Sequence, residues 1–148
     1  MELLLDEINK LANLDINRIL ADIFSDIGLQ KEILDRIRND QWNEQGVSES
    51  NVIIGVYSPY TEKINPNKKA KTPYTLHDTG ELSDSLKIDV DEFEKCITID
   101  VDGERNIEIV YKFDDKARSN ILGLTEENII WLIDKITPLI NEAIEAIL

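Results

Sequence analysis

The sequence of 148 residues contains one cysteine, one histidine, four prolines and no long hydrophobic run. Because Cys96 has no partner for an intrachain disulfide, we expect a fold held together by its core and synthesis in the cytoplasm. No apolar run approaches the length that crosses a bilayer. Residues 1–7 lack the basic region and apolar segment of a secretory signal. These absences predict one globular domain without disulfides and without a membrane segment.

The common catalytic and metal-binding motifs are also absent from the sequence. It has no phosphate-binding glycine loop, no Cys/His cluster of the zinc type and no HExxH. The segment 100–104 is acidic, but it does not match a calcium loop because Gly103 is misplaced and no closing glutamate follows. Exposed strand faces and a hairpin tip explain its acids. The sequence therefore predicts no cofactor and no metal ligand.

The single histidine allows one catalytic hypothesis. His77 stands beside Asp78, with Ser83 and Ser85 nearby, so a hydrolytic triad can be drawn. However, adjacent side chains of an extended segment point to opposite sides. The Asp78 side chain is also expected to cap a helix. We therefore predict no catalytic residues. A small hydrolase is the weakest of the three functional hypotheses considered below, after a structural protein and an acidic binding protein.

The charge balance is strongly acidic. Thirty acidic residues against 16 basic ones give a net charge of −14 at pH 7. Such a surface repels phosphate backbones, which argues against specific nucleic-acid binding. The simplest interpretation is the acidic surface of an ordinary soluble protein. An alternative is an acidic binding protein or inhibitor that imitates the charge of nucleic acid and acts on a basic partner.

Apolar residues at helical spacing fill the N-terminal part of the chain. Residues 2–14 form one amphipathic pattern, and Asp15 is expected to cap a second helix that stops at Gly28. A third helix is expected from about Leu29 to Gln45, with Trp42 on its inner side. The stripes are formed by Leu4, Ile8 and Leu11 in the first pattern, by Ile16, Ile19, Leu20, Ile23, Phe24 and Ile27 in the second, and by Ile33 and Ile37 in the third.

The middle of the chain alternates between apolar and polar residues, which is typical of strands. Segments 88–91, 97–101 and 107–113 predict an antiparallel three-stranded meander, with turns at 92–95 and at Asp102-Gly103. Residues 52–57 are expected to add a fourth strand.

A long helix is predicted from Thr125, its N-cap, to residue 148, with a kink or restart at Pro138. Trp131 helps to make this helix apolar around much of its circumference, so part of it is an interface candidate. The predicted fold class is α+β, with N-terminal helices, a small antiparallel sheet and a long C-terminal helix packed on the sheet. One domain, 1–148, contains the helical segment 1–46, the sheet region 52–113 and the helix 125–148.

A basic loop interrupts the acidic trend. Residues 57–75 carry four lysines against one glutamate, a net charge of +3. Three tyrosines lie in or beside the loop. It is either a docking element or a mobile solvated loop. In a self-assembling chain it would meet the acidic body of the next copy. The interface candidates are Lys63, Lys68, Lys69, Lys71, Tyr57, Tyr60 and Tyr74.

The segment 75–88 connects this loop to the sheet. Asp78 and Thr79 are good N-cap residues, and Asp78 with Glu81 has the spacing of a capping box. Gly80 permits a positive φ, and two leucines four residues apart are expected on one face of a short turn. The pattern consists of Leu76, Asp78, Thr79, Gly80, Leu82, Ser85 and Leu86.

This pattern, followed by strands and a C-terminal helix, resembles the head–tail joining and tail-completion proteins of tailed bacteriophages. Segment 122–128 and segment 57–61 with the lysine loop extend the resemblance over residues 52–148. It implies a non-enzymatic virion component of the neck or tail, made in the bacterial host cytoplasm. The implied partners are further copies in a ring homo-oligomer and neighbouring neck or tail proteins, without membrane contact. The longer N-terminal helical segment departs from this pattern, and a different interface is one use for its apolar surface.

Overall fold

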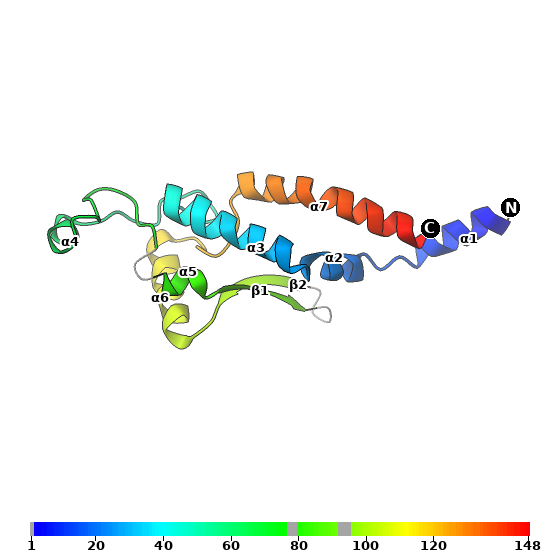
Figure 1. Cartoon of the computed structure of the whole chain (residues 1–148), viewed down its shortest axis with the longest axis horizontal. Coiled ribbons are helices and arrows are strands. Elements are labelled where there is room, and N and C mark those ends of the chain that lie inside the picture. The colour runs from blue at the N-terminus through cyan, green and yellow to red at the C-terminus, as the bar shows by residue number, and fades with distance from the viewer. Residues whose placement is uncertain (1, 77–79, 92–95) are drawn as a thin grey trace.

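The computed structural model describes residues 2–76, 80–91 and 96–148. It is a mixed helix-and-sheet structure with seven α-helices, one π-helix and a two-stranded antiparallel sheet in the described residues. The molecule is elongated (Figure 1): helix α4 lies at one end, and helix α1 lies at the other, beside the C-terminus of the chain. The mixed class expected from the sequence is confirmed, but the strand count is not.

The N-terminal segment folds as α1 (Glu2–Ala12), α2 (Ile16–Phe24) and α3 (Ile27–Asp35). The predicted cap of the second helix is confirmed, since the Asp15 carboxylate accepts a hydrogen bond from the amide of Arg18 at 3.2 Å. The predicted stop at Gly28 is wrong. Helix α2 ends at Phe24, and the Asp26 carboxylate accepts from the Leu29 amide at 2.8 Å, so Gly28 lies inside the first turn of α3.

Helix α3 continues directly into a π-helix, η1 (Arg36–Gln45). Ten residues is long for this conformation, which usually occurs as a single turn. The predicted end near Gly46 is confirmed: Gly46 adopts φ 64°, and a Cβ there would lie 2.6 Å from the Cβ of Pro73. Glycine is therefore required both by the left-handed backbone and by the close approach.

The sheet is a single hairpin. Strand β1 (Leu86–Asp91) pairs with β2 (Cys96–Val101), in a register that runs from Leu86 opposite Val101 to Asp91 opposite Cys96. The first two strands of the predicted meander are confirmed. The expected turn at 92–95 lies outside the described residues.

The predicted third strand is wrong, because 107–113 belongs to helix α6 (Glu104–Ala117). Gly103, at φ 93°, begins this helix rather than a hairpin, and the Asn106 side chain donates to the Asp102 carbonyl at 2.8 Å. The buried residues Asn106, Val110 and Ala117 follow helical spacing. The alternating isoleucines suggested a strand, yet Ile107 is exposed.

The predicted fourth strand is also wrong. Residues 52–57 make only isolated bridges, Val47 with Ile53 and Val56 with Pro73. The next residues, expected to be loop, form α4 (Pro59–Ile64). Ser58 caps α4 by accepting from the Thr61 amide at 3.1 Å, and Pro59 occupies its first turn, where a missing N–H costs nothing.

The connection into the sheet is short. Helix α5 (Glu81–Asp84) begins after Gly80, whose φ of 82° confirms the expected positive value. Leu82 is buried, as is Leu86, but Leu86 starts β1 instead of completing a helical turn with Leu82. The expected caps at Asp78 and Thr79 lie outside the described residues.

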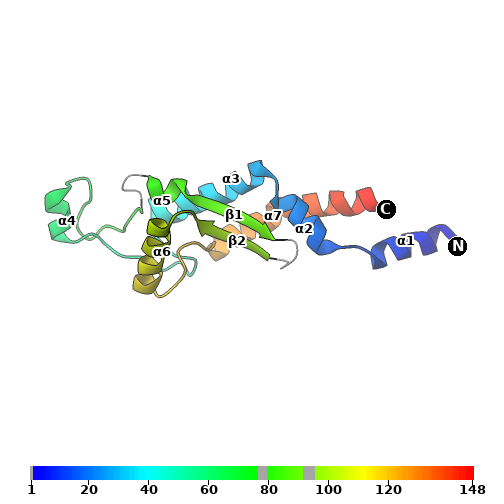
Figure 2. The ribbon, with the colours of Figure 1, turned by 90° about the horizontal axis from the view of Figure 1, so that it is seen from below.

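The long C-terminal helix α7 (Glu126–Ile147) is confirmed, as is its cap, because Thr125 Oγ1 accepts from the Asn128 amide at 3.4 Å. Of the two outcomes expected at Pro138, a restart is wrong, because α7 runs through this residue. The Asp134 carbonyl that loses its donor lies on an exposed part of the helix. The expected packing of this helix on the sheet is wrong: α7 packs chiefly on α2, and α2 and α3 contact β1. Figure 1 shows α3 between α7 and the strands, and Figure 2 shows the two strands of the hairpin from below.

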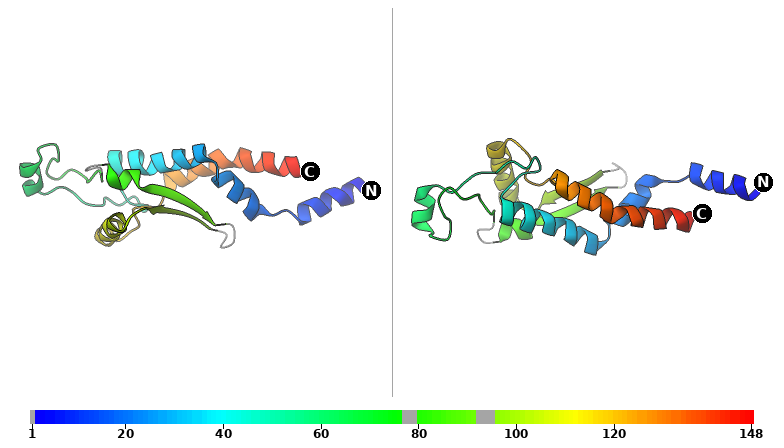
Figure 3. Two further views of the ribbon diagram at one scale, coloured as in Figure 1. Left: turned by 60° about the horizontal axis from the view of Figure 1, so that its bottom comes forward. Right: turned by 90° about the horizontal axis from the view of Figure 1, so that it is seen from above.

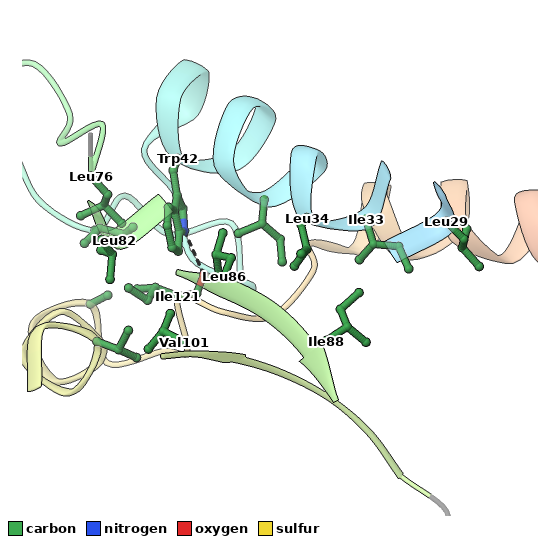
Figure 4. Packing of buried hydrophobic residues seen from close by; sticks show 14 of the residues in the cluster. Leu29, Ile33, Leu34, Trp42, Leu76, Leu82, Leu86, Ile88, Val101 and Ile121 are labelled. Carbon is green, nitrogen blue, oxygen red and sulfur yellow. Dashed lines mark hydrogen bonds between the residues drawn. The ribbon is translucent and has the colours of Figure 1, made fainter. Parts of the chain in front are cut away.

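The core lies between α3, η1, the hairpin and α6 (Figure 4). Trp42 is fully buried and donates its indole N–H to the Ile121 carbonyl at 3.0 Å. Next to it, the Gln41 side chain donates to the Gly123 carbonyl at 2.8 Å and accepts from the Thr125 amide at 2.9 Å and the Asn128 side chain at 2.8 Å. These bonds fix the start of α7 against η1.

Candidate assembly surfaces

A groove with a volume of about 420 Å³ lies between the base of the α4 segment, α5 and α6. Its aromatic side chains are in edge-to-face contact: the Tyr57 and Tyr74 ring centroids are 4.9 Å apart, and those of Tyr74 and Phe113 are 5.8 Å apart. Leu76, Leu82 and Ile109 complete its apolar lining. We call this cavity the α5–α6 groove.

Basic side chains line the same groove. The Lys68 ammonium group lies 5.8 Å from the Tyr57 ring centroid. Arg105 and Lys112, from α6, are exposed, and no carboxylate of the described chain lies within ion-pair distance of either. Glu81 is the one acidic residue among the described lining residues. The groove is therefore apolar and locally basic, in contrast to the acidic chain as a whole.

The lysine loop is held by several backbone hydrogen bonds. The Tyr57 amide donates to the Thr72 carbonyl at 3.0 Å, and the Lys71 amide donates to the Tyr57 carbonyl at 2.9 Å. Glu62 accepts from the Ala70 amide at 3.1 Å and forms a 3.8 Å ion pair with Lys69. The segment therefore has defined internal structure, and Lys69 is already paired within it.

At the tip of this segment, α4 carries two exposed apolar side chains. Tyr60 is 71% exposed and Ile64 is 66% exposed, one helical turn apart. Lys63 is exposed between them in the sequence. The tip thus combines apolar area with positive charge, as the interface hypothesis requires.

Trp131, the interface candidate on α7, is less exposed than Tyr60 on α4. It is partly buried, and the Arg36 guanidinium group lies 4.3 Å from its ring centroid. Lys135, one turn further on, pairs with Glu32 at 3.2 Å. Trp131 is therefore engaged with η1 within the chain.

The residues of the central pattern that the structure describes have packing roles. Leu76, Leu82 and Leu86 belong to the core cluster. The Ser85 hydroxyl donates to the Leu82 carbonyl at 2.7 Å and so helps to end α5. Asp78 and Thr79 lie outside the described residues, as does His77, on which the hydrolase hypothesis depends.

Two of the acids in and next to the strands form ion pairs with one lysine. The Lys87 ammonium group lies 2.9 Å from an Asp102 oxygen and 3.5 Å from an Asp89 oxygen. The hydrogen bond to Asp102, with the charges of both carboxylates, raises the pKa of Lys87. No group of three potential metal ligands is found in the residues that the structure covers.

Asp114 is a carboxylate in an unusual environment. It lies near the end of α6 and accepts the Ile121 amide at 2.8 Å. Partial burial raises its pKa, and the hydrogen bond from Ile121 opposes that effect. Its position indicates a role in holding the chain between α6 and α7.

Two apolar helix faces are exposed in the structure. On α1, Leu4 is 59% exposed and Leu11 is 49% exposed, and Leu5 and Ile8 fall between these values. On α7, Ile129, Ile130 and Ile133 are exposed. The sequence showed the amphipathic pattern of α1, but not that the helix leaves the body of the molecule.

No helix in the described segments is both long enough and apolar enough to cross a membrane. Comparison with protein-family models, curated proteins and solved structures finds no match to this chain.

Proposed function

We propose that this protein is a non-enzymatic structural subunit of a tailed-phage neck or tail, and that it acts as one copy in a ring. The observation that carries the proposal is its surface area. The chain exposes 10054 Å², whereas a compact monomer of this mass exposes about 7,700 Å². The excess of roughly 2,400 Å² is comparable to the area buried in stable protein interfaces.

The character of this surface also supports assembly. Exposed apolar side chains gather on α1, on the tip of α4 and along α7. Contiguous exposed apolar surface marks interaction sites in proteins. A subunit that contacts neighbours on more than one side requires such separated surfaces.

The described residues of the phage-protein pattern either pack in the core or shape the backbone. Leu76, Leu82 and Leu86 lie in the core, and Gly80 provides a left-handed turn. Their environment is that of a scaffold, which agrees with a mechanical role. The core would supply a rigid body, and the α4 segment would reach an adjoining copy or ring.

Light scattering behind a sizing column, at low and moderate salt, tests the proposal. We expect a discrete closed oligomer. The doubly reversed variant Lys63→Glu/Lys71→Glu should weaken contacts made by the α4 segment. Lys31→Glu, an exposed lysine on α3, is the control for reversed charge. The chain should also be present in purified particles of the phage that encodes it.

A chain that is monomeric under all these conditions and absent from particles would contradict the proposal. If that monomer instead bound a basic protein tightly and without self-assembly, the acidic inhibitor would replace the ring subunit as the favoured function.

A further inference from the structure

Helix α1 extends beyond the body of the molecule. Residues 4–13 are all exposed, and Figures 1 and 3 show the helix beyond α2 in every view. The tertiary hydrogen bond found for its described side chains joins the Lys10 ammonium group to the Leu148 carbonyl at 3.3 Å. The apolar face of α1 is therefore left uncovered by the described part of its own chain.

An isolated helix of this length is not stable in water. Helices shorter than about 12–15 residues are marginal on their own, because nucleation is unfavourable and few hydrogen bonds repay it. Helix α1 has 11 residues. Its amphipathic form predicts a partner that buries Leu4, Ile8 and Leu11 and leaves the polar face in water.

The α5–α6 groove has the complementary chemistry. Its aromatic and aliphatic lining matches the apolar face of α1, and Arg105 and Lys112 match Glu7, which lies at the edge of that face, one helical turn from Leu4 and from Leu11. A helix of this length occupies roughly 1,300 Å³. A groove of about 420 Å³ can therefore receive the side chains of one helix face, but not the whole helix.

The two surfaces lie at different ends of the molecule. Helix α1 forms the end near the C-terminus, whereas α5 and α6 lie toward the α4 end (Figures 1 and 2). A chain of this shape cannot bring α1 to its own groove without dismantling α2 and the linker 13–15. Two copies can, because the contact is then made between unlike surfaces of neighbouring molecules.

We propose that α1 of one copy docks in the α5–α6 groove of the next copy, in a head-to-tail contact. This inference rests on the proposed ring, for which it names the surfaces in contact. Contacts between unlike surfaces close into a ring or continue as a filament, depending on the rotation between copies. The contact buries the apolar face of α1 and brings Glu7 to the cations of the groove.

Two blocked variants test the contact in the full-length chain. Leu4→Gln/Ile8→Gln removes apolar area from α1 and retains good helix formers. Arg105→Glu/Lys112→Glu reverses the charge of the groove at exposed positions. We expect each variant to be monomeric by light scattering and to fold normally by circular dichroism. Asn9→Gln, on the polar face of α1, and Lys31→Glu should assemble as the unchanged chain does.

Mixing the two blocked variants gives the sharpest result. The groove variant keeps an intact α1, and the α1 variant keeps an intact groove, so one productive contact can form and no further copy can add. We expect a complex of two chains that contains one of each variant. Native mass spectrometry of the mixture, with one variant isotopically labelled, measures this composition.

A mixture that remains monomeric overturns the inference, as does persistent assembly of either blocked variant. In the second case the ring proposal survives and its contacts lie elsewhere. A wild-type chain that is monomeric at all concentrations overturns the docking model, whereas its absence from particles would count against the proposed function itself.

Discussion

At the scale of residues, caps and backbone-restricted positions were the most predictable features. Asp15 and Thr125 cap helices as expected, because their side-chain oxygens compete well for the free amides at a helix start. Glycines were harder to interpret. Gly80 has the expected positive φ, but Gly28 lies inside α3, and Gly103 begins a helix where a hairpin was predicted. Glycine permits a conformation without specifying the element that follows.

Asp114 provides a prediction about pH. Burial raises its pKa in the folded state, so the folded chain holds the proton more tightly than the unfolded chain. The contribution of this group to the free energy of unfolding therefore falls as the pH rises through its folded pKa. Asp114→Asn keeps an oxygen for the Ile121 amide and removes the charge. We expect its stability relative to wild type to be more favourable at pH 7 than at pH 3.

The matched change Asp114→Ala removes the acceptor as well. Ile121 is fully buried, so its unpaired amide should cost about 1–3 kcal/mol. Denaturant titrations at the two pH values measure both variants. An equal loss in the free energy of unfolding for Asp114→Asn and Asp114→Ala would contradict the role of the Asp114 side chain as acceptor for the Ile121 amide.

At the scale of elements, the helices with strong stripes and the two strands of the hairpin were predicted correctly, whereas the third and fourth strands were not. Residues 107–113 alternate in polarity, but the same residues also place Val110 and Ala117 on one buried helical face with Asn106. Both the two-residue period of a strand and the 3.6-residue period of a helix fit so short a segment, and tertiary packing decides between the two conformations. Residues 52–57 have strand-like composition, yet no neighbouring strand is available to extend their isolated bridges. The groove was missed for a related reason: it requires α6 to be a helix.

Helix α1 provides a prediction about stability. Because its apolar side chains are exposed in the isolated chain, deletion of residues 2–12 should change the thermal midpoint of the monomer by no more than about 2 °C. Ile33→Ala, a change in the core, should cost about 2–5 kcal/mol. Calorimetry of both variants makes the comparison. A large loss on deletion of α1 would show that the helix packs on its own body in solution.

At the scale of the whole molecule, the spacing of apolar residues predicted the mixed fold class, but neither spacing nor composition predicted the shape. Apolar fraction and length are compatible with a compact domain, whereas the chain is extended and leaves apolar faces in contact with solvent. An amphipathic stripe shows that a surface requires cover, but not which molecule provides it.

Net charge provides a prediction about salt. With −14 charges, the monomer repels itself, and screening should raise its thermal midpoint. The contact between the acidic α1 and the basic groove should weaken under the same screening. We therefore expect monomer stability and assembly to respond to salt in opposite directions between about 0.05 and 0.3 M. Scanning calorimetry of a blocked variant and light scattering of the wild-type chain measure the two responses, and assembly that strengthens with salt would exclude an electrostatic contact.

The exposure of α1 also affects how long an unassembled copy survives. A segment with no packing opens readily, and open backbone is what proteases cleave. Linker 13–15 joins this segment to α2 and, like α1, is largely exposed. In the proposed head-to-tail assembly, a copy with its N-terminal segment trimmed retains its groove and ends the growing chain without extending it. Proteolysis would thus remove surplus copies as subunits of that assembly and at the same time generate chain terminators. The supply of intact N-termini would then limit how many complete assemblies form.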